Sequence, residues 1–334
     1  MRLERVTVIG DGGWGTALAR LLATNGHAVC LWGAFPDYVD EMRRRRENVK
    51  FLPGIALPES LDLSGDLAEA VADADLLVSA VPTQFARRVL RKLARCYRRG
   101  VPVVSVTKGI ENRTLLRPTQ IVADVLGRRV PLAALSGPSH AEEVARGLPT
   151  TVAVASRRAD LACRVQRVFM AGRFRVYTNT DIVGVELGGA VKNVIAIAAG
   201  ICDGIGLGDN AKAALLTRGQ AEMTRLVVAL GARRDTFAGL AGMGDLITTC
   251  MSPYGRNRSV GVQIGQGKTR REILDGMEQV AEGVRTTQSV RALARRHGVE
   301  TPITEQCYRV LFRGKTPLRA VEDLMQRGPK GEVG

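Results

Sequence analysis

Aromatic residues and histidines are scarce in this chain of 334 residues. Phe, Trp and Tyr make up only 4% of it, and the three histidines, His27, His140 and His297, lie far apart. The six cysteines are scattered as well, and no two have the spacing of a zinc or thioredoxin motif. The chain therefore shows no sign of a metal site. It also has few of the aromatic side chains on which proteins stack single-stranded nucleic acid.

Lysine is rare too, although the chain is strongly basic. Only eight of its 48 basic residues are lysine, and the formal net charge is +15. Such a charge can attract nucleic acid or small acidic molecules. The arginine clusters at 43–46 and 87–99 have the pattern of solvated helix faces. We therefore expect the field to steer phosphorylated ligands, and we expect no nucleic-acid partner.

Long apolar runs are missing as well. None reaches the roughly 18 residues that a membrane span needs. The first residues, Met1 to Val6, lack the apolar core and cleavage site of a signal peptide. Hydrophobic residues make up 45% of the chain, which suits a globular protein with two domains of ordinary size. We expect a cytoplasmic protein that does not insert into a membrane.

Strand-like and helical patterns alternate in the first half of the chain. Continuous apolar runs predict buried strands, and the segments between them, such as 14–25 and 84–97, have helical periodicity. Buried strands separated by helices predict an α/β fold, with a doubly wound Rossmann-type parallel sheet covered on both faces. The expected strands are 6–9, 28–32, 76–81, 101–107, 132–136, 151–155 and 174–177.

A glycine-rich turn directly follows the first of these strands. Gly10, Gly12 and Gly15 fit the pattern G-x-G-x-x-G, and a predicted helix follows them. Gly10 permits a tight turn, Gly12 lets the backbone approach a pyrophosphate, and Gly15 lets the helix pack closely on the strand. The N-terminus of the helix offers free N–H groups to the anion. The segment is expected to bind a dinucleotide.

The pattern becomes helical from Asp181 to the end, with loops expected at 201–209 and 241–257. We therefore expect a dinucleotide-binding domain over residues 1–179 and an all-helical substrate and catalytic domain over residues 180–334.

The end of the second strand normally distinguishes NAD from NADP, because an acidic side chain there binds the ribose 2′-hydroxyl. Here Trp32 is followed by Gly33, Ala34 and Phe35, with no carboxylate, and Asp37 comes a little late. No arginine stands where it would select a 2′-phosphate. The sequence leaves NADPH and NADH open, with a lean to NADPH.

Lys192 is the most unusual residue in the second half. It lies in a helical stretch, 187–200, that is apolar on every side. A cation there is costly unless a partner compensates it. The lysine either snorkels its amine to water or acts as a partly desolvated group that binds an oxygen or gives up a proton near neutral pH. The segment alone leaves both interpretations open.

Several ordered motifs together resemble NAD(P)-dependent glycerol-3-phosphate dehydrogenases of the bacterial biosynthetic type. The resemblance runs from Val6 to about Gly314. It rests on the glycine turn, the Lys192 helix and the segments 51–54, 107–109, 136–139, 204–206, 242–250, 255–258 and 282–283. It implies a homodimer that interconverts dihydroxyacetone phosphate and sn-glycerol 3-phosphate for glycerophospholipid synthesis.

The resemblance also implies roles for single residues. Lys192 matches the proton donor, Lys108 the lysine that orients the substrate, and Asp245 the carboxylate that holds Lys192 and a substrate hydroxyl. Further residues match the substrate site: Gly137, Ser139, Asn193, Thr249, Gly255, and the phosphate-binding pair Arg256 and Asn257. Cofactor contacts are implied for Gly10, Gly12, Gly13, Trp14, Gly15, Ala34, Phe51, Lys108, Ala141, Arg256, Val280 and Glu282. His140 lies near the substrate loop but is expected to be a bystander.

Two positions depart from the pattern of the bacterial members. Gly255 replaces a serine that is frequent before the Arg-Asn pair, which puts one phosphate contact in doubt. Ala34 stands where many members have a basic or imidazole side chain near the ribose, which weakens the preference for NADPH.

Two other functions fit part of the sequence. A related lysine-dependent dehydrogenase could act on another phosphorylated substrate or on a hydroxy acid. A dinucleotide-sensing protein could use the basic surface to bind nucleic acid, and would then bind DNA in a strongly salt-dependent way. The segment 255–258 favours a phosphorylated substrate.

Overall fold

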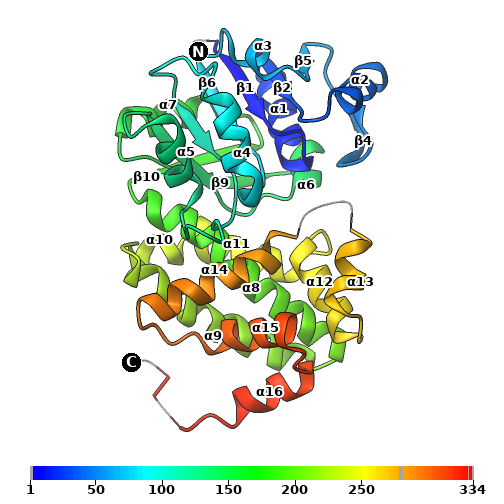
Figure 1. Ribbon diagram of the computed structural model, residues 1–334, viewed down its shortest axis with the longest axis vertical. Helices are drawn as coiled ribbons and strands as arrows, with labels where there is room; N and C mark the ends of the chain where they lie inside the picture. Colours follow the sequence, from blue (N-terminus) through cyan, green and yellow to red (C-terminus); the bar gives the residue numbers. More distant parts are fainter. Residues whose placement is uncertain (1–2, 278–280, 330, 333–334) are drawn as a thin grey trace.

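Strands and helices alternate through the first half of the computed structural model, which describes residues 3–277, 281–329 and 331–332. Figure 1 shows the sheet and its helices in the upper half of the molecule. The strands are β1 (Arg5–Ile9), β2 (Ala28–Trp32), β3 (Glu47–Asn48), β4 (Leu52–Ala56), β5 (Leu61–Ser64), β6 (Leu76–Ser79), β7 (Val103–Ser105), β8 (Leu132–Ser136), β9 (Thr150–Ala155) and β10 (Phe174–Asn179). The helices among them are α1 (Gly13–Thr24), α2 (Pro36–Arg45), α3 (Leu67–Val71), α4 (Thr83–Leu93), α5 (Pro118–Leu126), α6 (Ala141–Ala145) and α7 (Ala159–Phe169).

The main sheet of the described residues has eight strands in the order β10-β9-β8-β7-β6-β1-β2-β5. Six of its seven pairings are parallel, which confirms the predicted doubly wound α/β fold. The exception is β8, which pairs antiparallel with β9, so that β9 and β10 run against the other strands. The sequence pattern did not indicate this reversal, nor the strand β5 and the small antiparallel pair β3–β4.

The second half of the chain is helical, as predicted. Its elements are α8 (Ile182–Ile205), α9 (Gly208–Ala229), α10 (Arg234–Ala238), the π-helical turn η1 (Leu240–Gly244), α11 (Asp245–Met251), α12 (Arg256–Gly265), α13 (Arg270–Asp275), α14 (Glu282–Arg296), α15 (Pro302–Arg313) and α16 (Pro317–Met325). The last strand ends at Asn179, and α8 begins at Ile182. The division into domains at 179/180 stays a prediction.

The loops expected at 201–209 and 241–257 are largely wrong. Helix α8 continues to Ile205 and ends only at Gly206, whose φ of +73° suits glycine. The segment 240–251 is helical and packs tightly, because a Cβ at Gly188 of α8 would lie only 2.5 Å from the carbonyl oxygen of Ala241. Gly204 near the end of α8 is likewise a point of close approach between helices, because a Cβ there would lie 2.4 Å from the carbonyl oxygen of Val262 in α12.

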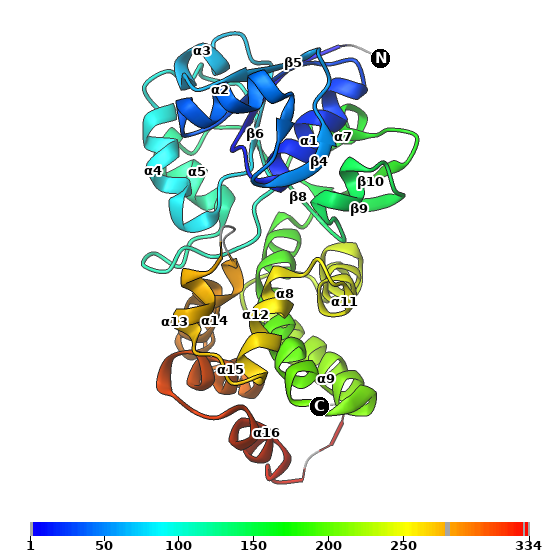
Figure 2. The ribbon, with the colours of Figure 1, turned by 90° about the vertical axis from the view of Figure 1, so that its right-hand side faces the viewer.

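Helix α8 runs through the centre of the helical half, surrounded by α9, α11, α12 and α14 (Figures 1 and 2). By length and composition it could cross a membrane, but 94% of its apolar window is buried inside the fold, as is typical of a core helix. The side chain of Asp181 caps its N-terminus by accepting a hydrogen bond from the N–H of Gly184 (2.8 Å).

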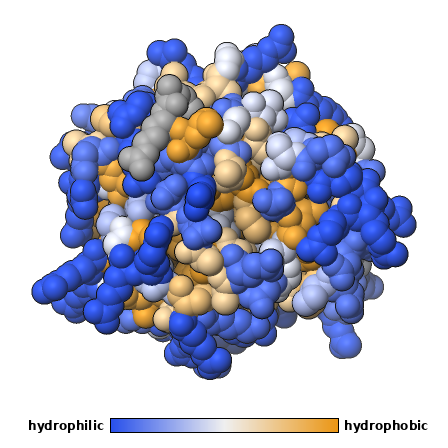
Figure 3. All heavy atoms as spheres, turned by 90° about the horizontal axis from the view of Figure 1, so that it is seen from above, coloured by the Kyte–Doolittle hydropathy of each residue, from blue (hydrophilic) through white to orange (hydrophobic). Residues whose placement is uncertain are grey.

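Figure 3 looks down on the sheet half of the molecule, where hydrophilic side chains project around the edge and apolar ones lie between them. Most arginines of the two predicted clusters are exposed, including Arg44, Arg45, Arg91 and Arg95. Arg87 instead lies half-buried on α4 and pairs with acidic side chains. The prediction of solvated helix faces is confirmed for the exposed arginines.

Candidate active site

The glycine-rich turn lies where the sheet changes direction. Strand β1 sits between β6 and β2, so the chain crosses to β2 on one side and later returns to β6 on the other. Gly10 has a φ of +117°, and a Cβ there would lie 3.0 Å from the backbone carbon of Ala80. A Cβ at Gly15 would collide with the carbonyl oxygen of Gly10, whereas no atom lies within 4 Å of the corresponding position at Gly12. The turn is closed at its ends and open at Gly12, which is the cradle that a pyrophosphate needs.

Four more of the predicted cofactor residues lie in or around this turn. A Cβ at Gly13 would lie 2.5 Å from the carbonyl oxygen of Phe51 and 3.7 Å from the Cβ of Ala141. Trp14 packs against the core beneath the turn, and its indole Nε1 is buried without a partner among the described residues. These residues pack beside the glycine turn, so their position fits the predicted role.

The other predicted cofactor residues are more dispersed. Ala34 is exposed just beyond the end of β2, and Val280 lies outside the described residues. Glu282, the first residue of α14, accepts a hydrogen bond from the N–H of Thr83 at the start of α4 (2.7 Å). Burial raises the pKa of its carboxyl group to about 7. Glu282 therefore connects the helical half to the first turn of a helix in the sheet half.

Asp245 joins the two predicted catalytic lysines. Its Oδ1 lies 2.5 Å from Nζ of Lys192, and its Oδ2 lies 2.9 Å from Nζ of Lys108. The Lys192 amine also donates to Oγ1 of Thr249, one turn further along α11. Asp245 directly follows the π-helical turn η1, a distortion that often marks functional sites. One carboxylate thus holds a lysine from each half of the molecule.

The Lys192 side chain is only 5% exposed. Desolvation lowers the pKa of its amine to about 8, and the positive charge of Lys108 acts in the same direction, while Asp245 opposes both. The alternative of a snorkelling lysine is therefore wrong, because the amine lies in the interior and ends on a carboxylate and a hydroxyl group. Such an amine can exchange a proton near neutral pH.

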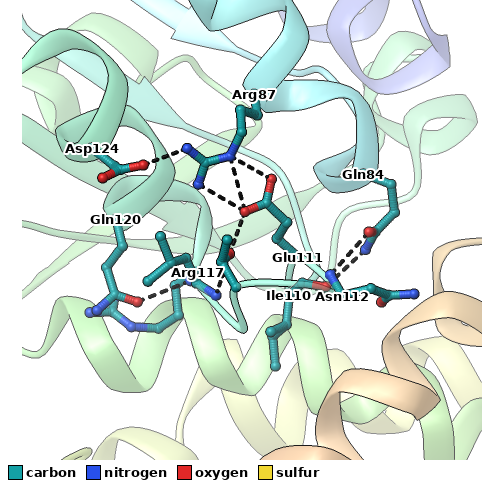
Figure 4. Close-up of polar contacts among 10 residues, drawn as sticks. Gln84, Arg87, Ile110, Glu111, Asn112, Arg117, Gln120 and Asp124 are labelled. Atoms are coloured by element: carbon teal, nitrogen blue, oxygen red, sulfur yellow. Dashed lines mark hydrogen bonds and ion pairs between the residues drawn. The ribbon is translucent and has the colours of Figure 1, made fainter.

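Lys108 lies on the loop after β7 and contacts the substrate-loop residues of the prediction. Its amine donates to the carbonyl oxygen of Gly137 (2.9 Å) and to Oγ of Ser139 (3.2 Å). Figure 4 shows how helix α4 anchors the loop. Gln84 donates to the carbonyl oxygen of Ile110 (2.8 Å), and α4 also contacts the next two residues of the loop, Glu111 and Asn112. The amine position is therefore determined by the surrounding backbone.

Glu111 and Asn112 on the same loop complete this anchoring. Arg87 of α4 forms an ion pair with Glu111 (2.9 Å), as Figure 4 shows. Asn112 connects to α14 in the helical half, where it donates to Oε1 of Gln288 (3.0 Å) and accepts from the hydroxyl group of Ser289 (2.7 Å). Because both halves hold the loop, Lys108 is fixed against Asp245 across the junction.

A cavity of about 110 Å³ lies beside the lysine pair. Asn257, buried near the start of α12, accepts a hydrogen bond from the N–H of Gly283 (2.9 Å). The predicted phosphate-binding residues thus meet the predicted catalytic residues at one cavity. Its wall is formed by Lys108, Ser139, His140, Lys192, Asn193, Asp245, Thr249, Tyr254, Gly255, Arg256, Asn257 and Glu282.

Two of these wall residues were not assigned a role from the sequence. His140, expected to be a bystander, has a buried Nε2 without a partner among the described residues. Burial and the two lysines lower the pKa of its imidazole. Tyr254 packs against His140 with ring centroids 5.9 Å apart and accepts a hydrogen bond from Arg146 (3.2 Å). Its position next to Gly255 in the sequence was the signal that could have indicated it.

Doubly wound sheets with such a glycine turn hold dinucleotides at the switch point. Here the turn faces a second, helical layer that supplies a buried lysine of lowered pKa and a set of polar groups. Fold and site together define a nicotinamide-dependent dehydrogenase with a Rossmann-type sheet followed by a helical half.

Comparison with known proteins narrows this class. Residues 5–162 match the model of the NAD-dependent glycerol-3-phosphate dehydrogenase N-terminus, and residues 181–322 match that of the C-terminus. A glycerol-3-phosphate dehydrogenase [NAD(P)+] of Citrifermentans bemidjiense is 54% identical over 331 residues, covering 98% of this chain and 99% of the relative. One of Geobacillus kaustophilus is 51% identical, covering 99% and 97%. The crystal structure of glycerol-3-phosphate dehydrogenase from Coxiella burnetii superposes with a TM-score of 0.94 at 40% identity, covering 97% of this chain and 99% of that one. The chain belongs to the NAD-dependent glycerol-3-phosphate dehydrogenase family.

Proposed function

We propose that this chain reduces dihydroxyacetone phosphate to sn-glycerol 3-phosphate, and catalyses the reverse reaction, with NAD(H) or NADP(H) as the cofactor. The observation that carries the proposal is Asp245, which ties Lys108 and Lys192 together at the cavity that Arg256 and Asn257 also line. The product would supply glycerophospholipid synthesis.

The cofactor would lie along the glycine turn at the switch point of the sheet. Gly12 offers the open approach for the pyrophosphate, while Gly13, Trp14, Phe51 and Ala141 surround it. When bound, the reduced nicotinamide supplies the hydride that the carbonyl carbon accepts. The polar groups of the helical half then have to bind the substrate and manage the charge on its oxygen.

The substrate phosphate carries two negative charges, which suits a bidentate arginine with an amide beside it. Arg256 and Asn257 are the first two residues of α12 and line the cavity. In this proposal the backbone N–H of Gly255, which here donates to the carbonyl oxygen of Ser252 (3.3 Å), turns to the phosphate in place of the missing serine hydroxyl. The phosphate would therefore be held at the α12 end of the cavity.

The carbonyl oxygen becomes an alkoxide during reduction and must be stabilised and protonated. Lys108 is held by Gly137, Ser139 and Asp245 and would orient this oxygen. Lys192 would donate its proton to the oxygen and take it back in the reverse reaction. A pKa of about 8 lets the amine serve in both directions near neutral pH. Asp245 is a positioning residue for both amines.

The remaining features of the proposal concern the whole molecule. We propose a dinucleotide-binding domain over residues 1–179 and a catalytic domain over 180–334, because the last strand ends at Asn179. Membership of the family supports a homodimer that works in the cytoplasm on a small phosphorylated substrate, without a nucleic-acid partner.

The proposal is tested by the loss of reduced-nicotinamide absorbance when purified protein meets dihydroxyacetone phosphate. We expect rapid oxidation that depends on the phosphorylated ketone and is absent with plain dihydroxyacetone. If folded protein oxidises neither NADH nor NADPH with this substrate, the proposal is wrong. A panel of other phosphorylated ketones and of keto acids would then test the related lysine-dependent dehydrogenases.

A further inference from the structure

Asp11 stands inside the glycine turn, but it is not part of the wall of the cavity beside the lysine pair. The residue is only 9% exposed. A Cβ at Gly33 would lie 2.6 Å from Oδ2 of Asp11, so the carboxylate lies directly against Gly33. Gly33 is the first residue after β2, and Ile9 and Trp32 are paired at the ends of β1 and β2. The carboxylate of Asp11 is therefore placed at the carboxyl end of β2.

The Oδ2 atom is buried and has no hydrogen-bond partner among the described residues. The turn itself is fixed, because the carbonyl oxygen of Asp11 accepts hydrogen bonds from Nδ2 of Asn48 (2.7 Å) and from Oγ1 of Thr16 (3.2 Å). Desolvation raises the pKa of the carboxyl group, while a hydrogen bond from the residue's own backbone N–H and the charge of Lys50 oppose this shift. A buried oxygen without a donor, held by a rigid backbone, is a feature for which a ligand hydroxyl would account.

The end of β2 is where doubly wound domains hold the adenosine ribose of a dinucleotide. An acidic side chain there accepts a hydrogen bond from the 2′-hydroxyl group and repels a 2′-phosphate. The strand itself provides no such group, since Gly33, Ala34 and Phe35 follow it. Asp37 lies in the first turn of α2 and is exposed. Asp11 of the neighbouring glycine turn places a carboxylate at this strand end instead.

We propose that Asp11 selects the cofactor by accepting a hydrogen bond from the ribose 2′-hydroxyl group and by repelling a 2′-phosphate. The chain then prefers NADH to NADPH, contrary to the preference for NADPH that the end of β2 alone suggests. This inference rests on the proposed function only in requiring a nicotinamide dinucleotide. It does not depend on which ketone is reduced.

Lys50 is the residue that favours the opposite outcome. It is exposed, and its amine lies 5.3 Å from the ring centroid of Phe51, next to the glycine turn. A cation in this place could bind a 2′-phosphate. Asp11 outweighs it because a buried carboxylate is poorly screened, whereas an exposed amine on a flexible stem is well screened by water and salt.

The test compares the dissociation constants of NADH and NADPH, measured by fluorescence titration without substrate. We expect the wild-type protein to bind NADH at least tenfold more tightly. Asp11→Asn keeps the shape of the side chain and removes its charge, so the ratio of the two constants should move at least fivefold toward NADPH. The matched control Asp37→Asn removes an exposed carboxylate near the same strand end and should leave the ratio unchanged.

Two results would overturn the inference: a wild-type protein that binds NADPH as well as NADH, or an Asp11→Asn variant with an unchanged ratio. A thermal scan reports whether that variant is folded. If the variant is not folded, competition by ADP and by 2′,5′-ADP on the wild-type protein decides the question. The proposed role of Asp11 predicts that ADP displaces NADH at a concentration at least tenfold lower than 2′,5′-ADP does. Lys50→Met adds a converse measurement: because Lys50 opposes Asp11, this variant should bind NADPH more weakly, keep its NADH binding and so prefer NADH more strongly. Since none of these titrations needs turnover, a failure to reduce dihydroxyacetone phosphate would not affect them.

Discussion

Nζ of Lys192 lies 2.5 Å from Oδ1 of Asp245 although 53 residues separate them in the sequence. The pair is almost fully buried, with side chains 5% and 2% exposed. A buried lysine and carboxylate of this kind are costly, and are retained where they perform a task. Desolvation, together with the charge of Lys108 on the other oxygen of Asp245, leaves Lys192 with a lowered pKa, as proton transfer requires.

Replacement of Lys192 by alanine should remove the proton donor and leave the cofactor site intact. General acid catalysis contributes roughly 10²–10⁴-fold to a rate, so kcat should fall by about that factor. Steady-state kinetics measures the loss, and fluorescence titration with the reduced dinucleotide checks that binding persists. Near-normal turnover by a folded Lys192→Ala protein would remove this residue from the mechanism.

The reaction rate should depend on pH through the Lys192 amine. Reduction needs the protonated amine, so kcat/KM for the ketone should fall as the pH rises through about 8, while oxidation of the alcohol should rise over the same range. The charged and polar groups facing this amine are Asp245, Thr249, Lys108, Cys250 and His140. Profiles between pH 7 and 10 in both directions measure the effect.

Asp245→Asn provides the check on that assignment. Asp245 raises the pKa of Lys192, so its neutralisation should move the alkaline limb of the reduction profile to lower pH. A limb that stays in place in this variant, or that persists in Lys192→Ala, would show that another group titrates.

Arg256→Ala should weaken the binding of the substrate phosphate. A hydrogen bond to a charged group contributes about 1.5–3 kcal/mol, which corresponds to a rise in KM of roughly tenfold or more. The matched control is Arg258→Ala, two residues further along α12, because Arg258 pairs with Asp203 (2.6 Å) and does not line the cavity. A change confined to the affinity for the dinucleotide would contradict the phosphate assignment.

Local patterns in the sequence predicted most of the fold. Runs of β-branched residues, the glycine turn after Ile9 and the change of periodicity near Asp181 each depend on neighbouring residues only, and the structure confirms the sheet and the helical half built on them. The antiparallel direction of β9 depends on how β8 and β9 pair across the connection that contains α6, and no local pattern encodes it. The loop expected at 241–257 was largely wrong because the segment 240–251 is helical and packs closely against Gly188 of α8.

The contacts within the candidate active site could not be predicted from local sequence patterns to the same extent. Physical chemistry alone singled out Lys192 as an unusual cation, whereas its contact with Asp245 needed the family resemblance or the structure. The Asp11 carboxylate was invisible because its neighbour Gly33 is distant in sequence and becomes adjacent only through the pairing of β1 with β2. Contacts between elements are what a single sequence reveals least.

Two glycines of the phosphate turn should respond to alanine in opposite ways. At Gly15 a Cβ would collide with the carbonyl oxygen of Gly10, whereas at Gly12 it would meet no atom within 4 Å. Overpacking of this kind costs roughly 1–3 kcal/mol, so Gly15→Ala should lower the thermal midpoint. Gly12→Ala should leave the midpoint unchanged and yet weaken dinucleotide binding at least tenfold, because the added methyl group occupies the space needed by the pyrophosphate. Thermal scans and fluorescence titrations of both variants measure the contrast. If Gly12→Ala bound the cofactor normally, the pyrophosphate would have to lie elsewhere.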